Sequence, residues 1–301
     1  MKLKYLFILV WMLISTSMFS QVKQDFAYKS VNGTDIDATI YLPELDEELP
    51  VLIYFHGGGF IFGNRTQGLE NILKEKLLEN KIAVISADYR LAPETSMEEI
   101  IKDAADIVSW VKTNGKEKFN INPNKIAVAG GSAGGYLALT TGFDPEYAPS
   151  AIITISAPTG FSTAGIQTGD TTLLKDIKKA SVISHGDYDT RMDLWRYMGK
   201  NGVALYGIFG FDPAKEPHKL EAYTLTNNIK TDYPPTMVIH AKNDRSVKLD
   251  EAQSLYNLLQ DKKIESELCI VENGHSSELI KQHPEVINKT IDFLNKLWNR
   301  K

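Results

Sequence analysis

The stretch Gly130-Gly131-Ser132-Ala133-Gly134-Gly135 lies between two apolar segments, at 126–129 and 136–139. This order indicates a strand, a tight turn and a helix, with Ser132 at the apex of the turn. Glycines on both sides of the serine suit the strained backbone of such a turn. The turn would therefore present the Ser132 hydroxyl at a helix N-terminus, where backbone N–H groups favour developing negative charge.

Taken alone, the pattern Gly-x-Ser-x-Gly is a weak signal. Glycine and serine each make up roughly 7% of an average chain, so a chance match in a chain of this length has odds of roughly one in ten. A glycine-rich turn without any chemical role fits the same residues. The rest of the chain has to decide between the two interpretations.

Composition and charge narrow the class of protein. The 301 residues are 43% hydrophobic and 24% charged, which is ordinary for a globular chain with one large or two small α/β domains. The net charge of -5 argues against nucleic acid or an anionic membrane surface as the main partner. The single cysteine, Cys269, can form no internal disulfide and is expected to be a small core side chain. No Cys/His spacing matches a metal site, so we predict no metal.

Residues 1–20 differ from the rest of the chain. Lys2 and Lys4 precede an apolar run at 5–14, and small residues follow up to Ser20. This pattern is typical of a secretory signal peptide, and the apolar run is shorter than the ~20 residues that a transmembrane helix needs. We therefore expect a periplasmic or secreted protein without stable membrane insertion, cleaved after Ser17 or Ser20.

The remainder, 21–301, indicates one domain in which strands and helices alternate. Asn32-Gly33 predicts a hairpin turn, and continuous apolar runs at 51–55 and 82–86 fit strands that are buried on both faces. Helical patterns occupy 69–80 and 97–114. Such alternation predicts a mostly parallel central sheet flanked by helices.

The alternation stops between 158 and 233, in a stretch rich in aromatic residues. We interpret this insertion as a cap over the site, although an irregular peripheral subdomain fits equally well. The earlier segment 88–94 holds two acids, one base and a proline, and we expect it to be an ion-paired loop that braces the wall of the site. His185 with Asp187 and Asp189 is too small a cluster to predict a metal site.

The strand at 51–55 ends in a run of glycines. Three successive glycines allow the backbone to turn its N–H groups into a cavity, which is what an oxyanion hole requires. A flexible loop is an alternative. A phosphate-binding loop is disfavoured, since no Gly-Lys-Ser/Thr follows and no helix starts directly. The predicted donors are the backbone N–H groups of Gly58, Gly59 and Ala133, with His56 and Gly57 supporting the loop.

A carboxylate and an imidazole also follow strands. Asp244 comes just past the strand at 235–240, and His275 follows the strand at 267–271. With the insertion set aside, Ser132, Asp244 and His275 are expected at the ends of three consecutive strands, where open α/β sheets place functional groups. Their order along the chain, Ser–Asp–His, is that of α/β-hydrolases. The serine would attack a carbonyl, the histidine would move the proton, and the aspartate would orient the imidazole.

Other acids and histidines fit these roles less well. Asp250 lies inside a predicted helix, so Asp244 is preferred as the acid. His240 lies inside a strand and is expected to be buried and hydrogen-bonded. His56 is better placed to brace the glycine loop than to act as a base.

The sequence resembles the hormone-sensitive-lipase-like carboxylesterases of the α/β-hydrolase superfamily. The resemblance rests on 56–60, 88–94, 130–135, Asp244 and His275, and it spans nearly all of the chain after residue 20. It implies an α/β-hydrolase fold and a serine carboxylesterase that acts on small acyl esters through an acyl-enzyme, with no metal or organic cofactor.

The chain departs from that group at two points. Many members have aspartate where this chain has Gly131, and the N-terminal segment is short for a full two-part cap. Related branches, such as feruloyl or acetyl esterases of plant polysaccharides and aryl-formamidases, share much of the pattern.

Three functions remain open at this point. The first is a serine esterase for short acyl chains on small-molecule or carbohydrate substrates, including acetyl or feruloyl esters. The second is a serine peptidase or amidase of the same fold, which is disfavoured because no large gating domain is recognisable. The third is a non-catalytic binding protein, although all three reacting residues are present. No oligomeric state is predicted.

Overall fold

The computed structural model describes residues 21–45, 47–161, 169–172, 174 and 183–299. The predicted signal segment, 1–20, lies outside the described residues. The described strands are β1 Gln21–Val31, β2 Thr34–Pro43, β3 Leu49–Phe55, β4 Ala83–Ala87, β5 Ile121–Gly131, β6 Ala151–Ile155, β7 Thr236–Ala241 and β8 Ser266–Val271.

The described helices follow the predicted alternation up to β6. They are α1 Asn71–Glu79, α2 Met97–Phe119, α3 Ala133–Thr140, α5 Tyr188–Lys200, α6 Ala204–Phe209, the 3-10 helix η1 Pro217–Tyr223, α7 Leu225–Asn228, α8 Leu249–Asp261, α9 Ser277–Gln282 and α10 Glu285–Trp298.

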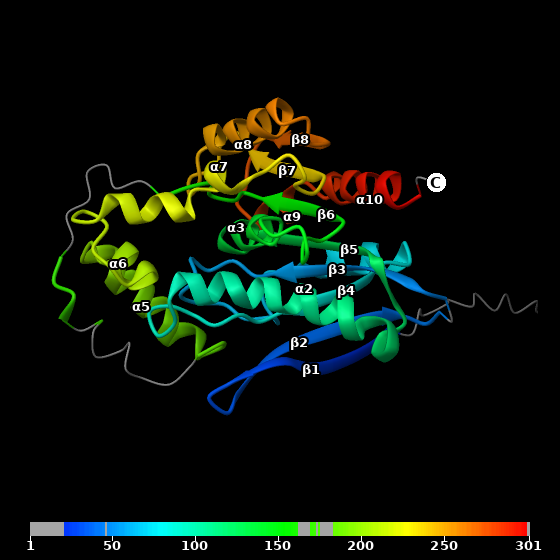
Figure 1. Cartoon of the computed structure of the whole chain (residues 1–301), viewed down its shortest axis with the longest axis horizontal. Helices are drawn as coiled ribbons and strands as arrows, with labels where there is room; N and C mark the ends of the chain where they lie inside the picture. The colour runs from blue at the N-terminus through cyan, green and yellow to red at the C-terminus, as the bar shows by residue number, and fades with distance from the viewer. Residues whose placement is uncertain (1–20, 46, 162–168, 173, 175–182, 300–301) are drawn as a thin grey trace, which may run out of the picture.

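The strands of the described part form one eight-stranded sheet in the order β1-β2-β4-β3-β5-β6-β7-β8 (Figure 1). The predicted hairpin is confirmed, since β1 and β2 pair antiparallel around Asn32-Gly33. The pair β2–β4 is also antiparallel, and every pair from β4 to β8 is parallel. The sheet is therefore mostly parallel, as predicted.

Side chains of the central strands alternate between two hydrophobic cores. In β3, Val51, Ile53 and Phe55 belong to one cluster, and Leu52 and Tyr54 belong to the other. The first cluster includes the buried faces of α2, α3 and α8, and the second includes those of α1, α9 and α10. Helices thus cover both faces of the sheet, which explains why the central strands are continuous apolar runs.

Helix α2 runs further than its sequence pattern predicts. The predicted end lies at Asn114, before Gly115, but Gly115 is buried inside the helix, and a Cβ there would lie 3.3 Å from Ile121. The helix ends instead at Phe119 and is capped by Asn120, which has a left-handed backbone (φ 54°) and donates its N–H to the Gly115 and Lys116 carbonyls. Glycine serves here for close packing on β5, and asparagine ends the helix.

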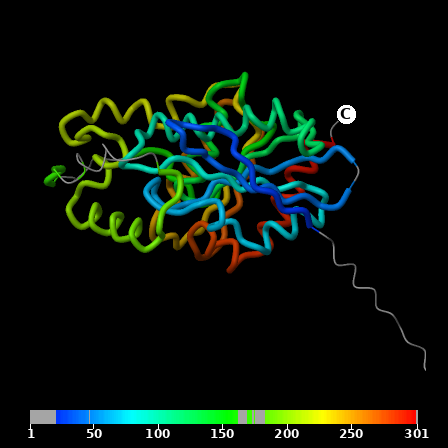
Figure 2. The backbone as a smooth tube through the Cα atoms, turned by 90° about the horizontal axis from the view of Figure 1, so that it is seen from below, coloured from blue at the N-terminus to red at the C-terminus, as the bar shows by residue number. Residues whose placement is uncertain are grey.

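The described residues between β6 and β7 form helices and loops at the end of the molecule toward which the parallel strands point (Figure 1). Figure 2 shows α5 and α6 gathered at this end, far from the C-terminus. These helices therefore lie where the carboxyl ends of the strands place functional groups.

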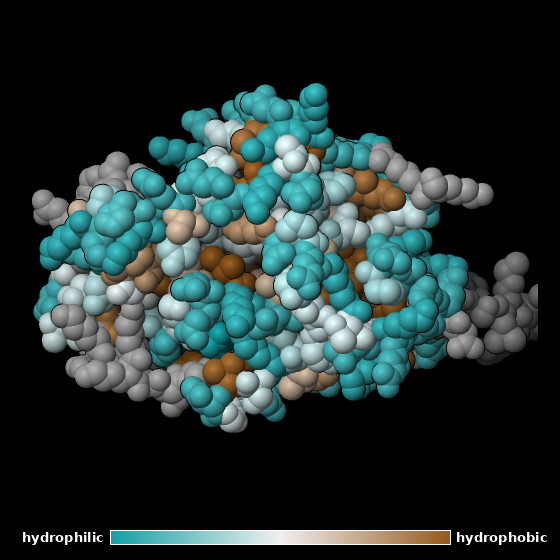
Figure 3. Space-filling model, in the orientation of Figure 1, coloured by the Kyte–Doolittle hydropathy of each residue, from teal (hydrophilic) through white to brown (hydrophobic). Residues whose placement is uncertain are grey.

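The face in Figure 3 is mostly hydrophilic, and hydrophobic residues show mainly in the recesses between polar side chains. No helix in the described ranges is long and apolar enough to span a membrane.

The central position of Ile53 gives a test of the core. Ile53 is fully buried in β3, between β4 and β5. We expect Ile53→Ala to lower the free energy of unfolding by about 2–5 kcal/mol, because it removes buried methylene groups and leaves a cavity. Urea denaturation measures the change.

The matched control is Ile270→Ala on the edge strand β8, where the isoleucine is 37% exposed. The control should change stability by only about 0.5 kcal/mol. Equal effects of the two substitutions would contradict the assigned core.

Candidate active site

Ser132 occupies a sharp turn between β5 and α3. Its backbone has φ 55° and ψ -122°, a conformation that costs free energy for any residue with a side chain. The turn brings backbone segments into contact, and only glycine leaves room for this. A Cβ on Gly130 would collide with the backbone of Gly134, and a Cβ on Gly134 would collide with the carbonyl of Phe55. The Ser132 N–H donates to the Ile155 carbonyl at 2.9 Å, which ties the turn to β6.

The glycine loop after β3 lies against this turn. Gly58 and Gly59 have φ of +115° and +57°, values that L-residues rarely adopt. The Gly58 carbonyl accepts hydrogen bonds from the N–H groups of Ile61 and Phe62 at 3.0 and 3.1 Å. A Cβ on Gly57 would lie 3.4 Å from the Cβ of Ser132. The loop is therefore held in a tight turn directly beside the serine.

The predicted oxyanion donors border one cavity. Gly58, Gly59, Ser132 and Ala133 all line it. Ala133 is the first residue of α3, and the first N–H groups of a helix have no partner within the helix. The structure thus brings the glycine loop and a helix N-terminus together around Ser132, which is the arrangement that stabilises an oxyanion.

His56 supports the glycine loop from behind. Its ring is buried, stacks on Tyr89 with centroids 4.2 Å apart, and holds the Gly57 carbonyl at 2.7 Å from Nδ1. Tyr89 in turn donates its hydroxyl to the His56 carbonyl at 2.8 Å. Burial lowers the pKa of His56 to about 4, despite the opposing hydrogen bond to Gly57. A neutral, immobilised ring suits a brace better than a base.

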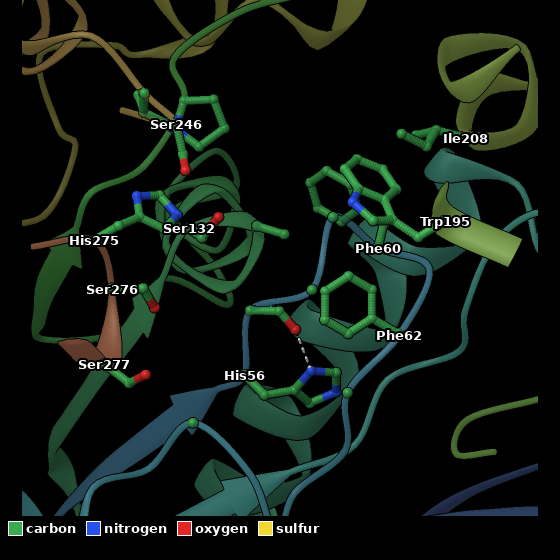
Figure 4. Close-up of a pocket in the computed structure, with 18 of the residues that line it drawn as sticks. His56, Phe60, Phe62, Ser132, Trp195, Ile208, Ser246, His275, Ser276 and Ser277 are labelled. Carbon is green, nitrogen blue, oxygen red and sulfur yellow. Dashed lines mark hydrogen bonds between the residues drawn. The ribbon is translucent and has the colours of Figure 1, made fainter. Parts of the chain in front are cut away.

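Asp244 and His275 lie at the ends of β7 and β8 and form a pair. The distance from His275 Nδ1 to Asp244 Oδ2 is 2.7 Å, and the aspartate side chain is fully buried. In Figure 4 the imidazole of His275 and the hydroxyl of Ser132 point toward one another at one side of the cavity. The structure therefore brings all three predicted residues to one place.

The loop after β7 holds the Asp244 carboxylate in position. Oδ1 accepts the backbone N–H groups of Ser246 and Val247 at 2.8 and 3.0 Å. Burial raises the pKa of Asp244, but hydrogen bonds from the His275 ring and from these two N–H groups outweigh it and bring the value down to about 2. Asp244 is thus an ionised acceptor for His275 over the ordinary pH range.

His240 is buried at the end of β7, as the sequence predicts. Its Nε2 lies 3.0 Å from the Val247 carbonyl and 3.7 Å from Asp244 Oδ2. The ring fastens the loop that carries the two N–H donors. The rival acid Asp250 lies in the first turn of α8 and is exposed.

The three residues do not follow three consecutive strands, and that expectation is wrong. In the sheet, β6 lies between β5 and β7, because the short apolar strand 151–155 completes a parallel crossover before the insertion begins. Its end contributes Ser156, whose Oγ accepts the Ser276 N–H at 3.2 Å. Ser276 directly follows His275, so the end of β6 anchors the turn that carries these two residues, which we call the histidine turn.

Gly131, one of the two departures from the esterase pattern, has a local cause. A Cβ at this position would collide with the Ser276 side chain. Ser276 itself has φ 54° and ψ -120°, nearly the conformation of Ser132. A side chain at 131 would therefore displace the histidine turn.

The cavity around Ser132 has a volume of about 590 Å³ and two kinds of wall (Figure 4). Polar side chains border the side that carries His275, and apolar side chains border the opposite side. The polar wall includes Ser246, Ser276 and Ser277, whereas His56 lies next to Phe62. The apolar wall includes Phe60, Phe62, Phe161, Tyr188, Trp195, Leu205 and Ile208.

The predicted ion-paired loop at 88–94 is confirmed. Asp88 binds the Arg65 side chain and, at 2.6 Å, its backbone N–H. Arg90 binds Asp103 at 2.8 Å. The third pair joins Glu94 to Arg191 of α5 at 2.7 Å.

No group of three or more His, Cys, Asp or Glu residues in the described part of the chain has the geometry of a metal site. Asp187, part of the weak cluster in the insertion, caps α5 by accepting the Thr190 N–H at 2.9 Å.

The BD-FAE family model matches residues 38–259, most of the described sheet and the insertion. The chain belongs to the BD-FAE family. Its fold is that of the α/β-hydrolases, as two solved structures show. An acetyl ester-xyloside bifunctional hydrolase from Caldicellulosiruptor lactoaceticus superposes with a TM-score of 0.69 at 18% identity, covering 91% of this chain and 96% of that one. An α/β-hydrolase superfamily protein from Enterococcus faecalis gives 0.71 at 20% identity, covering 91% and 99%.

Sequence relatives include the carboxylesterase NlhH of Mycobacterium tuberculosis, which is 38% identical over 109 residues, 35% of this chain and 33% of that protein. The non-reducing polyketide synthase atr1 of Stereocaulon alpinum is 34% identical over 155 residues, 46% of this chain and 6% of the synthase. This BD-FAE member thus matches a third or less of the length of either relative.

The low pKa of Asp244 predicts a pH dependence of stability. Because the folded value of about 2 lies below the ordinary ~3.9 of the unfolded chain, the carboxylate stabilises the fold above about pH 4. This stabilisation is lost as the pH falls through about 2. The free energy of unfolding of wild type should exceed that of Asp244→Asn by on the order of 2 kcal/mol at about pH 6.

Urea denaturation of both proteins at a series of pH values measures this difference, which should shrink between about pH 4 and about pH 2. A difference that stays constant over that range would show that the ionised carboxylate is not the stabilising form.

Proposed function

We propose that this protein is a serine carboxylesterase that hydrolyses short-chain acyl esters through an acyl-enzyme. The observation that carries the proposal is the buried Asp244 carboxylate 2.7 Å from His275, whose ring lines the same cavity as the strained Ser132. An aspartate that holds an imidazole next to an exposed serine hydroxyl is the arrangement of serine hydrolases on several unrelated folds.

Each residue has a defined step in this mechanism. The Ser132 Oγ attacks the ester carbonyl carbon while His275 Nε2 takes its proton, and Asp244 stabilises the resulting imidazolium through Nδ1. The carbonyl oxygen becomes an oxyanion that accepts the N–H groups of Gly58, Gly59 and Ala133. Collapse of the tetrahedral intermediate then breaks the bond to the alcohol, which leaves with the proton from His275.

Hydrolysis of the acyl-enzyme repeats these steps with water. His275 takes a proton from the water as its oxygen attacks the acyl carbon, and returns it to the Ser132 Oγ as the acid leaves. The same oxyanion donors serve both halves of the reaction. The proposal requires no group beyond the side chains and backbone of the chain.

The cavity supports small substrates. Its volume of about 590 Å³ lies within the ~300–1,000 Å³ of typical small-molecule sites. The aromatic wall offers flat apolar area for an acyl group or a sugar face, and the facing wall offers hydroxyl groups. Acetyl or feruloyl carbohydrate esters are therefore the substrates we propose to test first, which agrees with the name of the xyloside-active structural relative.

We also propose that the protein is exported. Residues 1–20 have the pattern of a signal peptide. Mass spectrometry of the protein from a periplasmic or culture fraction should give a mature N-terminus after Ser17 or Ser20. Full-length protein confined to the cytosol would contradict export.

The nucleophile is tested with Ser132→Ala on a p-nitrophenyl ester series from acetate upward. We expect kcat to fall by about 10⁴–10⁶, because the covalent step is removed. Turnover in wild type should be highest for the shorter acyl chains.

The control is Ser254→Ala on the exposed face of α8, which should retain wild-type turnover. Equal, slow rates in wild type and Ser132→Ala would overturn the esterase proposal and favour a binding protein. Faster hydrolysis of peptide anilides than of esters would favour an amidase. Release of acetate or ferulate from acylated oligosaccharides tests the carbohydrate substrates.

A further inference from the structure

One face of α5 is directed at the active site. Tyr188, Arg191 and Trp195 are spaced by three and four residues, so they lie on one face of the helix. Tyr188 and Trp195 line the cavity, and Arg191 is buried between them. An arginine in this position needs partners for its charge and its N–H groups, and these partners lie outside the insertion.

Arg191 makes three hydrogen bonds to two loops of the hydrolase domain. Its Nε donates to the Ile61 carbonyl at 2.7 Å, its Nη1 to Glu94 Oε1 at 2.7 Å, and its Nη2 to the Ala92 carbonyl. The side chains of Arg191 and Glu94 are 6% and 4% exposed. The guanidinium therefore bridges the glycine loop and the 88–94 loop, and each of its three nitrogens donates a hydrogen bond.

The two residues whose carbonyls Arg191 bonds, Ile61 and Ala92, also hydrogen-bond through their N–H groups to the glycine loop, which we call the oxyanion loop from here on. The Ile61 N–H bonds the Gly58 carbonyl at 3.0 Å, and the Ala92 N–H bonds the Phe60 carbonyl at 2.8 Å. Phe60 also has a left-handed backbone, with φ 65°. Arg191 thus holds Ile61, which follows the two glycines in the same turn. Gly58 and Gly59 of this turn line the cavity.

Trp195 packs on the same turn from the cavity side. A Cβ on Gly59 would lie 2.9 Å from its indole ring, so the ring rests on the glycine backbone. One helix therefore contacts the oxyanion loop through a hydrogen-bonding side chain and through an aromatic one.

We propose that Arg191 is a positioning residue that sets the geometry of the oxyanion hole from within the insertion. The inference rests on the proposed esterase function and adds to it a role for a residue outside the reacting set. Arginine is required because a planar fork can bond two carbonyls and a carboxylate at once, whereas lysine offers a single ammonium group. Glu94 compensates the buried charge through Oε1, while its Oε2 has no hydrogen-bond partner among the described atoms.

The test compares Arg191→Lys with Arg196→Lys. Both arginines lie on α5, but Arg196 is 69% exposed and forms an ion pair with Asp193 one turn away. The double variant Arg191→Met/Glu94→Met removes both charges and leaves neither buried and unpaired. It carries the test if Arg191→Lys does not fold, as judged by circular dichroism.

Three quantities separate positioning from a general structural role: kcat, KM and the inhibition constant of phenylboronic acid. The boronate forms a tetrahedral adduct with serine and resembles the transition state. Displacing the oxyanion donors by about 1 Å can cost about 100-fold in rate. In Arg191→Lys and in the double variant we expect kcat to fall at least about tenfold, KM to change little, and the boronate constant to rise in proportion. Arg196→Lys should match wild type in all three.

Unchanged kcat in Arg191→Lys and the double variant would overturn the inference. A lower kcat with an unchanged inhibition constant of phenylboronic acid would also overturn it. The inhibition constant does not depend on the fraction of active protein, so this result would indicate only a loss of folded enzyme. Failure of the esterase proposal is recognised separately, since wild type itself would then be inactive. Active wild type with normal Arg191 variants would refute only the positioning role.

Discussion

The site depends on a backbone that is forced into an unfavourable conformation at Ser132. The strain at φ 55° persists because surrounding atoms leave no room to relax. Glycines 130 and 134 let two backbones touch, and the Ser132 N–H is fixed on β6. A parallel sheet makes this possible, since several strand ends and one helix N-terminus converge there. The serine is thereby exposed to the cavity while the segments around it are buried.

A second requirement is a negative charge in a buried place. Asp244 has no exposed side-chain surface, and a lone carboxylate there would become protonated. Two backbone N–H groups and the imidazole prevent this by donating to both of its oxygens. His240 holds the same loop through Val247. The acid is therefore oriented before any substrate binds, which is how preorganised sites avoid the cost of rearrangement.

The sequence was sufficient for the fold and for the residues brought together at the site, because both follow from local rules. Apolar runs that end in glycine, aspartate or histidine mark strand ends, and Ser132, Asp244 and His275 all follow such runs. The same rule could have drawn attention to Ser156, which directly follows β6. It could not reveal that Ser156 bonds the Ser276 N–H, since that contact joins residues far apart in the chain.

Other features had no local signal at all. The backbone donors of Ser246 and Val247 depend on how one loop folds back on its own aspartate. Arg65 lies in an irregular segment and Arg191 in a helix of the insertion, and only tertiary structure shows that they pair with Asp88 and Glu94. Tertiary packing also overrode the helix-breaking tendency of Gly115 in α2.

Strand β6 contributes no reacting group, yet its end bonds to both turns that do. The Ile155 carbonyl accepts from Ser132, and the hydroxyl of the next residue accepts from Ser276. The serine and histidine turns are thus both attached at one strand end, through the last residue of β6 and the residue directly after it. Thermal motion that shifts β6 should carry both turns in the same direction. The distance between Ser132 and His275 would then fluctuate less than the position of either residue.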